Sequence, residues 1–281
     1  MITYFCSIGY MYYAKINDPI LGPPGVRILL CFRGFAGFFG IFGLYLSLQY
    51  LSLSDSIVLT FLTPLCSTAI GCWLLKERLA VREVVAMVVS LVGVVLIARP
   101  PFLFGGRGSS ENEGDVSGGQ RMISVGAALI GVAGVTGEYT LIRAIGKRAH
   151  PLHNIAYLSA FCVLSSSVGM VVSRTRVSIP TRWSFAFLLV LVGLFGLFAQ
   201  MLMTMGFQRE AVGRAAMGVY TGIVYALILG KVVFGNVPGP LSIVGTVLIL
   251  GSAVWVVVMR EAMKEPVHEE VEIGLLDRSG E

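Results

Sequence analysis

The segment that decides the fold is Arg33–Pro64, RGFAGFFGIFGLYLSLQYLSLSDSIVLTFLTP, which contains two hydrophobic spans in succession. The first span carries glycine at every third position: Gly34, Gly37, Gly40 and Gly43. In a helix this spacing leaves a slanted strip without side chains, against which another helix can lie. Glycine costs about 1 kcal/mol relative to alanine inside a soluble helix, so the strip favours a membrane, where small residues let helices approach closely.

The second span starts after Asp55 and contains Pro64. A proline deep in a helix removes a hydrogen bond and frees a carbonyl group, which a membrane protein tolerates where neighbours or a water-lined cavity satisfy that group. Asp55 lies just before the helical run, and we expect its carboxylate to cap exposed backbone N–H groups. Both residues are therefore assigned structural roles.

The composition of the whole chain is that of a polytopic membrane protein. Of the 281 residues, 56% are hydrophobic and only 13% are charged, and the mean hydropathy is +0.82. In soluble domains about a quarter of the residues are charged. The net charge of +5 comes from basic residues that flank apolar runs, which indicates topology and not nucleic-acid binding. The five cysteines form no CxxC pair, so neither disulfides nor a metal site is expected.

Apolar runs predict an all-α integral membrane fold with about nine transmembrane helices. Residues 2–14 are too few to cross a hydrocarbon core of about 30 Å, and we expect them to be part of a transmembrane helix. The eight longer runs lie at 28–51, 56–75, 82–98, 122–142, 152–172, 184–206, 211–230 and 240–258.

A linker at 100–120, rich in Gly, Ser and acidic residues, divides the chain into two halves, 1–99 and 121–260. The acidic tail at 261–281 is expected to be disordered. FGIF at 39–42 and FGLF at 195–198 form a weak internal repeat, which is typical of transporter folds built from two inverted repeats.

Positive charges favour one orientation of the chain. With alternate loops placed on one side and the loop at 76–78 assigned to the cytosol, fourteen Lys and Arg residues lie on the cytosolic side and seven on the other. The positive-inside rule then predicts a cytosolic C-terminus and a non-cytosolic start.

Glu138 is the first candidate for a functional residue, because its carboxylate lies well inside an apolar run. Ionisable residues at such depth are costly and are functional by default. Glu138 can bind a cation or a proton, or it can pair with Arg143 along one helix, and both interpretations stay open. Arg33, at the end of its span, can meet an anionic substrate or snorkel to the interface, and snorkelling is the commoner behaviour of a terminal arginine.

Six polar or amphipathic residues within the spans are candidates for the lining of a polar cavity: Tyr45, Gln49, Thr60, Gln200, Tyr220 and Tyr225. Each of them can instead hydrogen-bond a neighbouring helix. His150 and His153 have a ligand-like spacing, but the proline between them breaks a helix and no third ligand is near, so no metal is expected. The sequence has no Ser-His-Asp order, phosphate loop or HExxH motif, and neither an enzyme nor a cofactor is expected.

Several sequence blocks occur in an order and at a spacing typical of one transporter family. They are RGFAGFFGIFG at 33–43, YLSLQYLSLSD at 45–55, TP at 63–64, LLKER at 74–78, SLVGVVLIARP at 90–100, Gln200, FQREAVGRAA at 207–216 and Tyr220. In these blocks the chain resembles the EamA type of the drug/metabolite transporter superfamily, nearest the solute carrier 35 group G branch. The resemblance implies ten helices in two inverted five-helix repeats, of which we expect the first helix to be missing here.

The main hypothesis is a secondary transporter or exchanger of a small polar or anionic metabolite, which works by alternating access around a cavity near the membrane midplane. The alternative is a transport-inactive membrane scaffold or regulator, or a truncated family member. The expected partners are a small-molecule substrate and the lipid bilayer, with a homodimer or a partner helix as a further option. The sequence predicts a multi-pass protein of the plasma membrane or an endomembrane.

Overall fold

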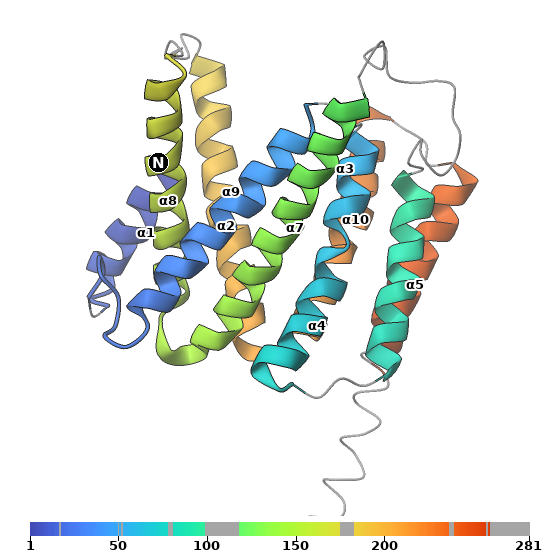
Figure 1. Ribbon diagram of the computed structural model, residues 1–281, viewed down its shortest axis with the longest axis horizontal. Coiled ribbons are helices and arrows are strands. Elements are labelled where there is room, and N and C mark those ends of the chain that lie inside the picture. Colours follow the sequence, from blue (N-terminus) through green and yellow to red (C-terminus); the bar gives the residue numbers. More distant parts are fainter. Residues whose placement is uncertain are drawn as a thin grey trace, which may run out of the picture. The chain divides into compact units, whose positions relative to one another are not determined.

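The computed structural model describes residues 1–16, 18–49, 51, 53–77, 81–98, 118–174, 183–235, 239–256 and 258, and its regular elements there are helices (Figure 1). In chain order they are α1 (Ile2–Tyr13), α2 (Arg27–Ser47), α3 (Leu53–Thr60), α4 (Thr63–Leu75), α5 (Val81–Ala98), α7 (Gly118–Ile145), the 3-10 helix η1 (Gly146–Arg148), α8 (Pro151–Val172), α9 (Trp183–Arg209) and α10 (Val212–Phe234). An apolar helix without a label follows at Pro240–Val256.

The helices have the lengths and the composition of membrane spans. Among the described residues, seven helical segments are long and apolar enough to cross a membrane, and Asp55–Leu75, which joins α3 and α4, is one of them. Pro240–Val256 is shorter, and α1, with 12 residues, extends over about 18 Å. Each apolar run in the sequence therefore corresponds to helix, and the fold is an all-α integral membrane fold.

The chain folds into two compact units that do not follow the predicted halves of the sequence. Unit 1 comprises Met1–Glu77 and Gly108–Ala216, and unit 2 comprises Arg78–Arg107 and Met217–Glu281. Two inverted repeats stay a prediction. The tail at 261–281 and most of the predicted linker lie outside the described residues, but the last three linker residues already belong to α7.

The glycine strip of α2 packs against α7 in unit 1, and Figure 1 shows the blue α2 beside the green α7. All four strip glycines are buried. An alanine Cβ at Gly40 would lie 2.7 Å from the Val135 side chain, and one at Gly43 would collide with the backbone of Gly131. Gly34 faces α8 instead. The predicted strip that accepts another helix is thus confirmed.

The span predicted at 56–75 consists of two helices, because α3 ends at Thr60 and α4 begins at Thr63. Pro64 lies in the first turn of α4, where a missing N–H group costs little. The prediction of a proline deep inside one helix is therefore wrong. The carbonyl oxygen of Thr60 accepts a hydrogen bond from Thr63 Oγ1 at 2.5 Å, so a neighbour satisfies the group that the proline leaves without a donor.

Asp55 is the third residue of α3, which begins at Leu53, and not the residue before the helix. The predicted position is therefore wrong by a few residues. The buried carboxylate still lies in the first turn, where a negative charge favours the positive end of the helix dipole.

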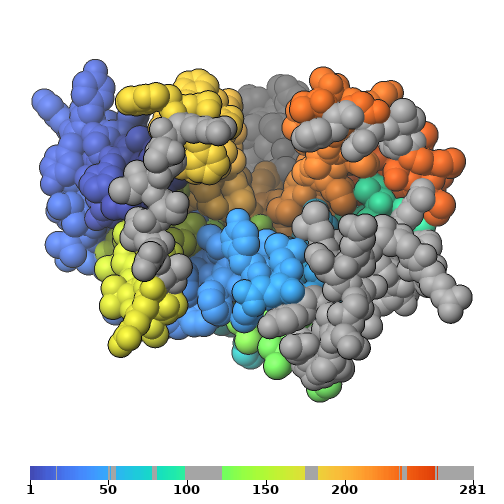
Figure 2. Space-filling view, turned by 90° about the horizontal axis from the view of Figure 1, so that it is seen from above, coloured from blue at the N-terminus to red at the C-terminus, as the bar shows by residue number. Residues whose placement is uncertain are grey.

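The short helix α1 packs against α8 and α9 within unit 1. Met11 of α1 is buried in a cluster with Leu152, Ile155 and Ala156 of α8. Figure 2 shows the blue atoms of the N-terminal segment beside the yellow atoms of α8. This packing positions α1 over one side of the candidate site.

Unit 2 is held together by α5 and the helix Pro240–Val256. The hydroxyl oxygens of Ser90 and Ser252 lie 2.5 Å apart in a hydrogen bond. The two helices also meet at Gly93 and Gly245, where an alanine Cβ at Gly93 would lie 2.7 Å from the carbonyl oxygen of Gly245. Small residues and a buried polar contact are the usual means of close helix packing in membranes.

Candidate functional site

A buried ion pair between α2 and α7 is the centre of the candidate site. Arg33, on the second turn of α2, has a fully buried side chain, and Glu138 of α7 is 5% exposed. Arg33 Nη2 donates a hydrogen bond of 2.8 Å to Glu138 Oε1. The pair therefore places two opposite charges inside the helix bundle of unit 1.

The glycine strip makes room for this pair. Gly37 follows Arg33 by one turn of α2, and an alanine Cβ there would lie 2.8 Å from Glu138 Oε2 and 2.6 Å from the Leu158 side chain. The absence of a side chain at Gly37 lets the carboxylate lie directly against the α2 backbone. The strip that brings the two helices together thus also shapes the charged site.

The guanidinium group of Arg33 has further partners on α8 and α9. Its Nη1 donates to the carbonyl oxygen of Asn154 at 2.7 Å, and its Nη2 reaches Gln200 Oε1 at 3.4 Å. Its buried Nε has no hydrogen-bond partner among the described residues, and neither do the two amide atoms of the Asn154 side chain. The site therefore holds polar groups whose hydrogen-bonding capacity is not used up, which is unusual for buried atoms.

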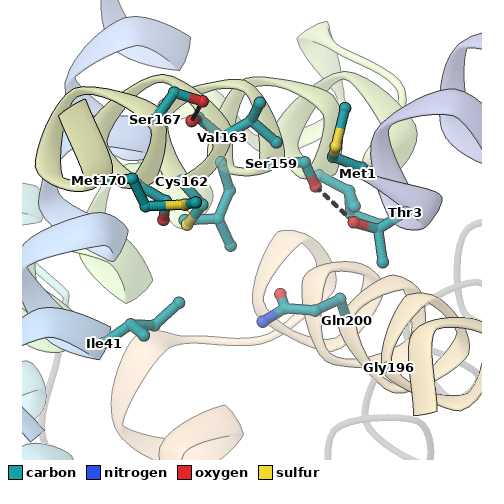
Figure 3. Close-up of a pocket in the computed structure, with 13 residues that line it drawn as sticks. Met1, Thr3, Ile41, Ser159, Cys162, Val163, Ser167, Met170, Gly196 and Gln200 are labelled. Carbon is teal, nitrogen blue, oxygen red and sulfur yellow. Dashed lines mark hydrogen bonds between the residues drawn. The ribbon is translucent and has the colours of Figure 1, made fainter. Parts of the chain in front are cut away.

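An open cavity of about 460 Å³ lies next to this cluster and is lined by parts of α1, α2, α8 and α9 (Figure 3). Gln200 belongs both to its lining and to the partners of Arg33. Figure 3 shows the Gln200 amide directed into the space that Ile41 borders on the other side. On the far wall the hydroxyl groups of Thr3 and Ser159 are hydrogen-bonded at 3.0 Å. Through Gln200 the cavity adjoins the ion pair.

The structure brings together three of the predicted pathway residues: Arg33, Glu138 and Gln200. Arg33 does not snorkel, because its side chain is buried, and that interpretation is wrong. Pairing of Glu138 with Arg143 is wrong as well, since Glu138 binds Arg33 and Arg143 binds Glu77. The fully buried guanidinium finds its opposite charge on a different helix.

Three other predicted pathway residues of unit 1, Tyr45, Gln49 and Thr60, have no described hydrogen bond to this cluster. Tyr45 and Gln49 are exposed, and Tyr225 of unit 2 is exposed as well. Thr60 donates its hydroxyl group to the Ser56 carbonyl oxygen in its own helix. Tyr220, also in unit 2, is buried. Their place in a substrate pathway stays a prediction.

Sequence reasoning missed Asn154, Thr3 and Ser159. Asn154 was detectable, because its amide lies in an otherwise apolar run, where a polar side chain is worth explaining. The two hydroxyl groups gave no such signal, since serine and threonine occur throughout membrane helices as local hydrogen-bond donors.

Glu77 forms a second polar cluster, at helix ends. Its Oε1 accepts from Arg143 Nε at 2.8 Å, and its Oε2 accepts from the backbone N–H of Val212, the first residue of α10, at 2.9 Å. Arg143 also donates to the Gln208 carbonyl oxygen at 3.3 Å. One carboxylate thereby joins the ends of α4, α7 and α10. From the sequence, the residues at 76–78 were used only to assign topology.

The histidines form structural contacts. His150 is the residue before α8, and its Nδ1 accepts a hydrogen bond from the backbone N–H of Leu152. His153 Nε2 lies 3.1 Å from the carbonyl oxygen of Asp18. Within the described part of the chain, no group of three or more His, Cys, Asp or Glu residues is arranged to hold a metal ion.

Within the described residues, seven helices long and apolar enough to cross a membrane, with a buried ion pair beside a cavity, define a multi-pass membrane protein with charged groups at depth. Membrane transporters belong to this class. The EamA-like transporter family matches residues 1–99 and 122–258, and the chain belongs to this family.

Several known proteins similar to this chain carry transporter names. It is 35% identical over 275 residues to the probable transport protein YPL264C of Saccharomyces cerevisiae. The aligned region covers 95% of this chain and 78% of the yeast protein. It is 31% identical to human solute carrier family 35 member G1, over 83% of this chain and 63% of the human protein. A solved crystal structure shares the fold with a TM-score of 0.72 at 18% identity, over 93% of this chain and 86% of the other.

Proposed function

We propose that this protein is a secondary transporter of a small polar or anionic metabolite and that it works by alternating access. The metabolite would bind at Arg33, Glu138 and Gln200. The observation that carries the proposal is the buried Arg33–Glu138 pair, with unused hydrogen-bonding capacity beside a cavity. Membership in the EamA-like transporter family and the names of the relatives support transport as the activity.

The energetic cost of the pair favours a functional role. Removing two charges from water is expensive, and an apolar pair of similar volume usually stabilises a protein as well as a buried ion pair does. A charged pair inside a membrane bundle therefore has to be explained by something besides stability. Binding of a charged substrate explains it.

Arg33 is the group that a substrate anion would contact. Its Nε is unpartnered among the described residues, and its contact to Gln200, at 3.4 Å, is the longest of its three. An incoming carboxylate or phosphate can use Nε and replace Gln200 without first breaking the 2.8 Å bond to Glu138. A bound anion would also weaken the hold of Arg33 on Glu138, which could then take up a proton or a cation.

The proposal is tested by uptake into liposomes that contain the purified full chain. A panel of carboxylates, phosphates and neutral polar metabolites is offered with and without a pH gradient. We expect uptake of at least one substrate class, loss of that uptake per folded protein in Glu138→Gln, and a dependence on the gradient if Glu138 carries the proton.

A variant in which both charges are removed separates function from folding. Arg33→Met with Glu138→Met leaves no unpaired buried charge, so the variant should fold. Uptake by this double variant would show that the pair is structural and would remove it from the transport site. Absence of uptake of every panel member by the unmodified chain would instead favour the scaffold alternative.

A further inference from the structure

A second cavity, of about 300 Å³, lies in unit 1 where η1, the start of α8 and the end of α9 meet. It is separate in its lining from the cavity beside Arg33, with no residue in common. Its lining includes Lys147, His150, Met201, Met205, Gln208 and Arg209. We infer that this cleft binds the phosphate headgroup of an anionic phospholipid, a site that goes beyond the proposed transport function and does not depend on it.

The cleft carries two cations that form no ion pair with a described carboxylate. Lys147 and Arg209 are exposed, and neither forms an ion pair with an acidic residue in the described part of the chain. The acidic side chains near this end are engaged elsewhere, since Glu77 binds Arg143 and Glu210 binds Arg214. The described lining of the cleft contains no carboxylate. A phosphate group would therefore meet two unopposed positive charges.

His150 shapes the cleft without adding charge at neutral pH. Its Nδ1 accepts the hydrogen bond from Leu152 N–H, which requires an unprotonated nitrogen. Burial, together with the nearby imidazole of His153, lowers the pKa of His150. The charge of the cleft at neutral pH therefore comes from Lys147 and Arg209.

The floor of the cleft favours a lipid over a free phosphate. Met201 and Met205 lie one turn apart on α9 and are half-buried. Flexible thioether side chains adapt to an irregular apolar chain such as a fatty acid. Gln208 is fixed at the bottom, where its Nε2 donates to the Ala149 carbonyl oxygen at 3.1 Å. A cationic rim above an apolar floor matches a phospholipid, which carries its phosphate directly above its acyl chains.

The position of the cleft agrees with the same ligand. It lies at the ends of helices with the length of membrane spans, at the side that the charge count assigns to the cytosol. The cytosolic leaflet holds the anionic lipids, and basic clefts between transmembrane helices on that side bind their headgroups. A bound lipid would connect the end of α9 to the α7–α8 connection.

The test is native mass spectrometry of the detergent-purified full chain, titrated with phosphatidylserine or with phosphatidylcholine of the same acyl chains. We expect saturable binding of phosphatidylserine and at least tenfold weaker binding of phosphatidylcholine. Lys147→Gln with Arg209→Gln should weaken phosphatidylserine binding by about thirtyfold, the effect of two lost charge contacts near a membrane surface.

A matched control removes two other cations at the same end of the molecule. Lys15→Gln with Lys76→Gln changes the net charge equally, and both residues are exposed and outside the cleft. We expect less than a threefold change in this control. An equal loss in both double variants would mean that only the general surface charge acts, and would overturn the proposal.

Two more measurements separate a lipid from a soluble phosphate. Inorganic phosphate, added as a competitor at about 10 mM, should leave phosphatidylserine bound. Met205→Gln, which adds a polar group to the floor without changing charge, should weaken lipid binding severalfold at an unchanged melting temperature. Displacement by inorganic phosphate, or the absence of any preference for phosphatidylserine, would refute a phospholipid site.

Discussion

Two arginine–glutamate pairs in unit 1 have the same N–O distance and different surroundings. Arg33 with Glu138 and Arg143 with Glu77 are both separated by 2.8 Å. The first pair has side chains 0% and 6% exposed, whereas the second has side chains 29% and 15% exposed. Burial, and not distance, thus distinguishes the two contacts.

The difference extends to the hydrogen bonds that each pair leaves unused. Both carboxylate oxygens of Glu77 are bonded, one to Arg143 and one to the N–H of Val212. Arg33 retains a buried Nε without a partner in the described residues, beside a cavity. The Glu77 cluster, in which both carboxylate oxygens are bonded, connects the ends of α4, α7 and α10. The partly satisfied cluster deep in the bundle keeps a buried donor that the described residues do not use.

The largest expected effect is on the buried pair. Glu138→Met alone leaves the Arg33 charge buried without a counter-charge, and we expect the free energy of unfolding to fall by about 3–5 kcal/mol. Adding Arg33→Met should recover most of this loss, because the double variant has no unpaired charge. The measurement is chemical or thermal unfolding of the detergent-purified variants, compared as a double-mutant cycle. Additive losses would contradict the coupling of the two residues.

A smaller effect should follow from crowding the same carboxylate. Gly37→Ala places a methyl group 2.6 Å from the Leu158 side chain and 2.8 Å from Glu138 Oε2, so both side chains must shift. Overpacking of this kind costs about 1–3 kcal/mol. The matched control is Gly126→Ala on α7, where a Cβ would have no neighbour within 4 Å. We expect the control to be neutral or slightly stabilising, and equal losses in both variants would contradict the crowding at Gly37.

The glycine strip was predictable because its cause is local. A repeat of three residues in an apolar helix leaves a side chain-free face whatever the rest of the chain does. The partner of that face was not predictable, since Gly131 lies far along the chain and nothing near the strip specifies it. The break between α3 and α4 was not predicted either. Pro64 was identified in the sequence, but its position alone did not show that the helix ends before it, at residues 61–62.

The candidate site was predictable only in part, for the same reason. Glu138 was identified as a charge inside an apolar run and Arg33 as a charge at the end of a span, but they are 105 residues apart. Arg143, five residues from Glu138, offered a local partner, although only residues three or four apart are neighbours on one helix face. Burial decides the actual pairing, because a buried guanidinium requires the carboxylate that tertiary packing brings to it.

The partly buried pair, Arg143 with Glu77, should respond less than the fully buried one. Glu77→Ala removes the acceptor for Arg143 and for the first N–H group of α10, and we expect the free energy of unfolding to fall by about 1–2 kcal/mol. Glu77→Gln keeps an oxygen for Val212 and should lose about half as much. Uptake per folded protein should stay unchanged in both variants. A loss of uptake at full stability would show that Glu77 is part of the transport mechanism.

Gln200 should show the smallest effect on stability and still change transport. Its contact to Arg33, at 3.4 Å, is too long to stabilise the fold strongly, so Gln200→Leu should alter the free energy of unfolding by less than about 0.5 kcal/mol. If the substrate replaces Gln200 at Arg33 and then bonds the displaced Gln200 amide, loss of that hydrogen bond should raise KM about fivefold at an unchanged kcat. Phe198→Leu, an exposed position on the same helix, should change neither quantity. An unchanged KM in Gln200→Leu would mean that the substrate in the cavity does not depend on Gln200. The Arg33–Glu138 pair would then resemble the Glu77 cluster in having a structural role, in spite of its deeper burial.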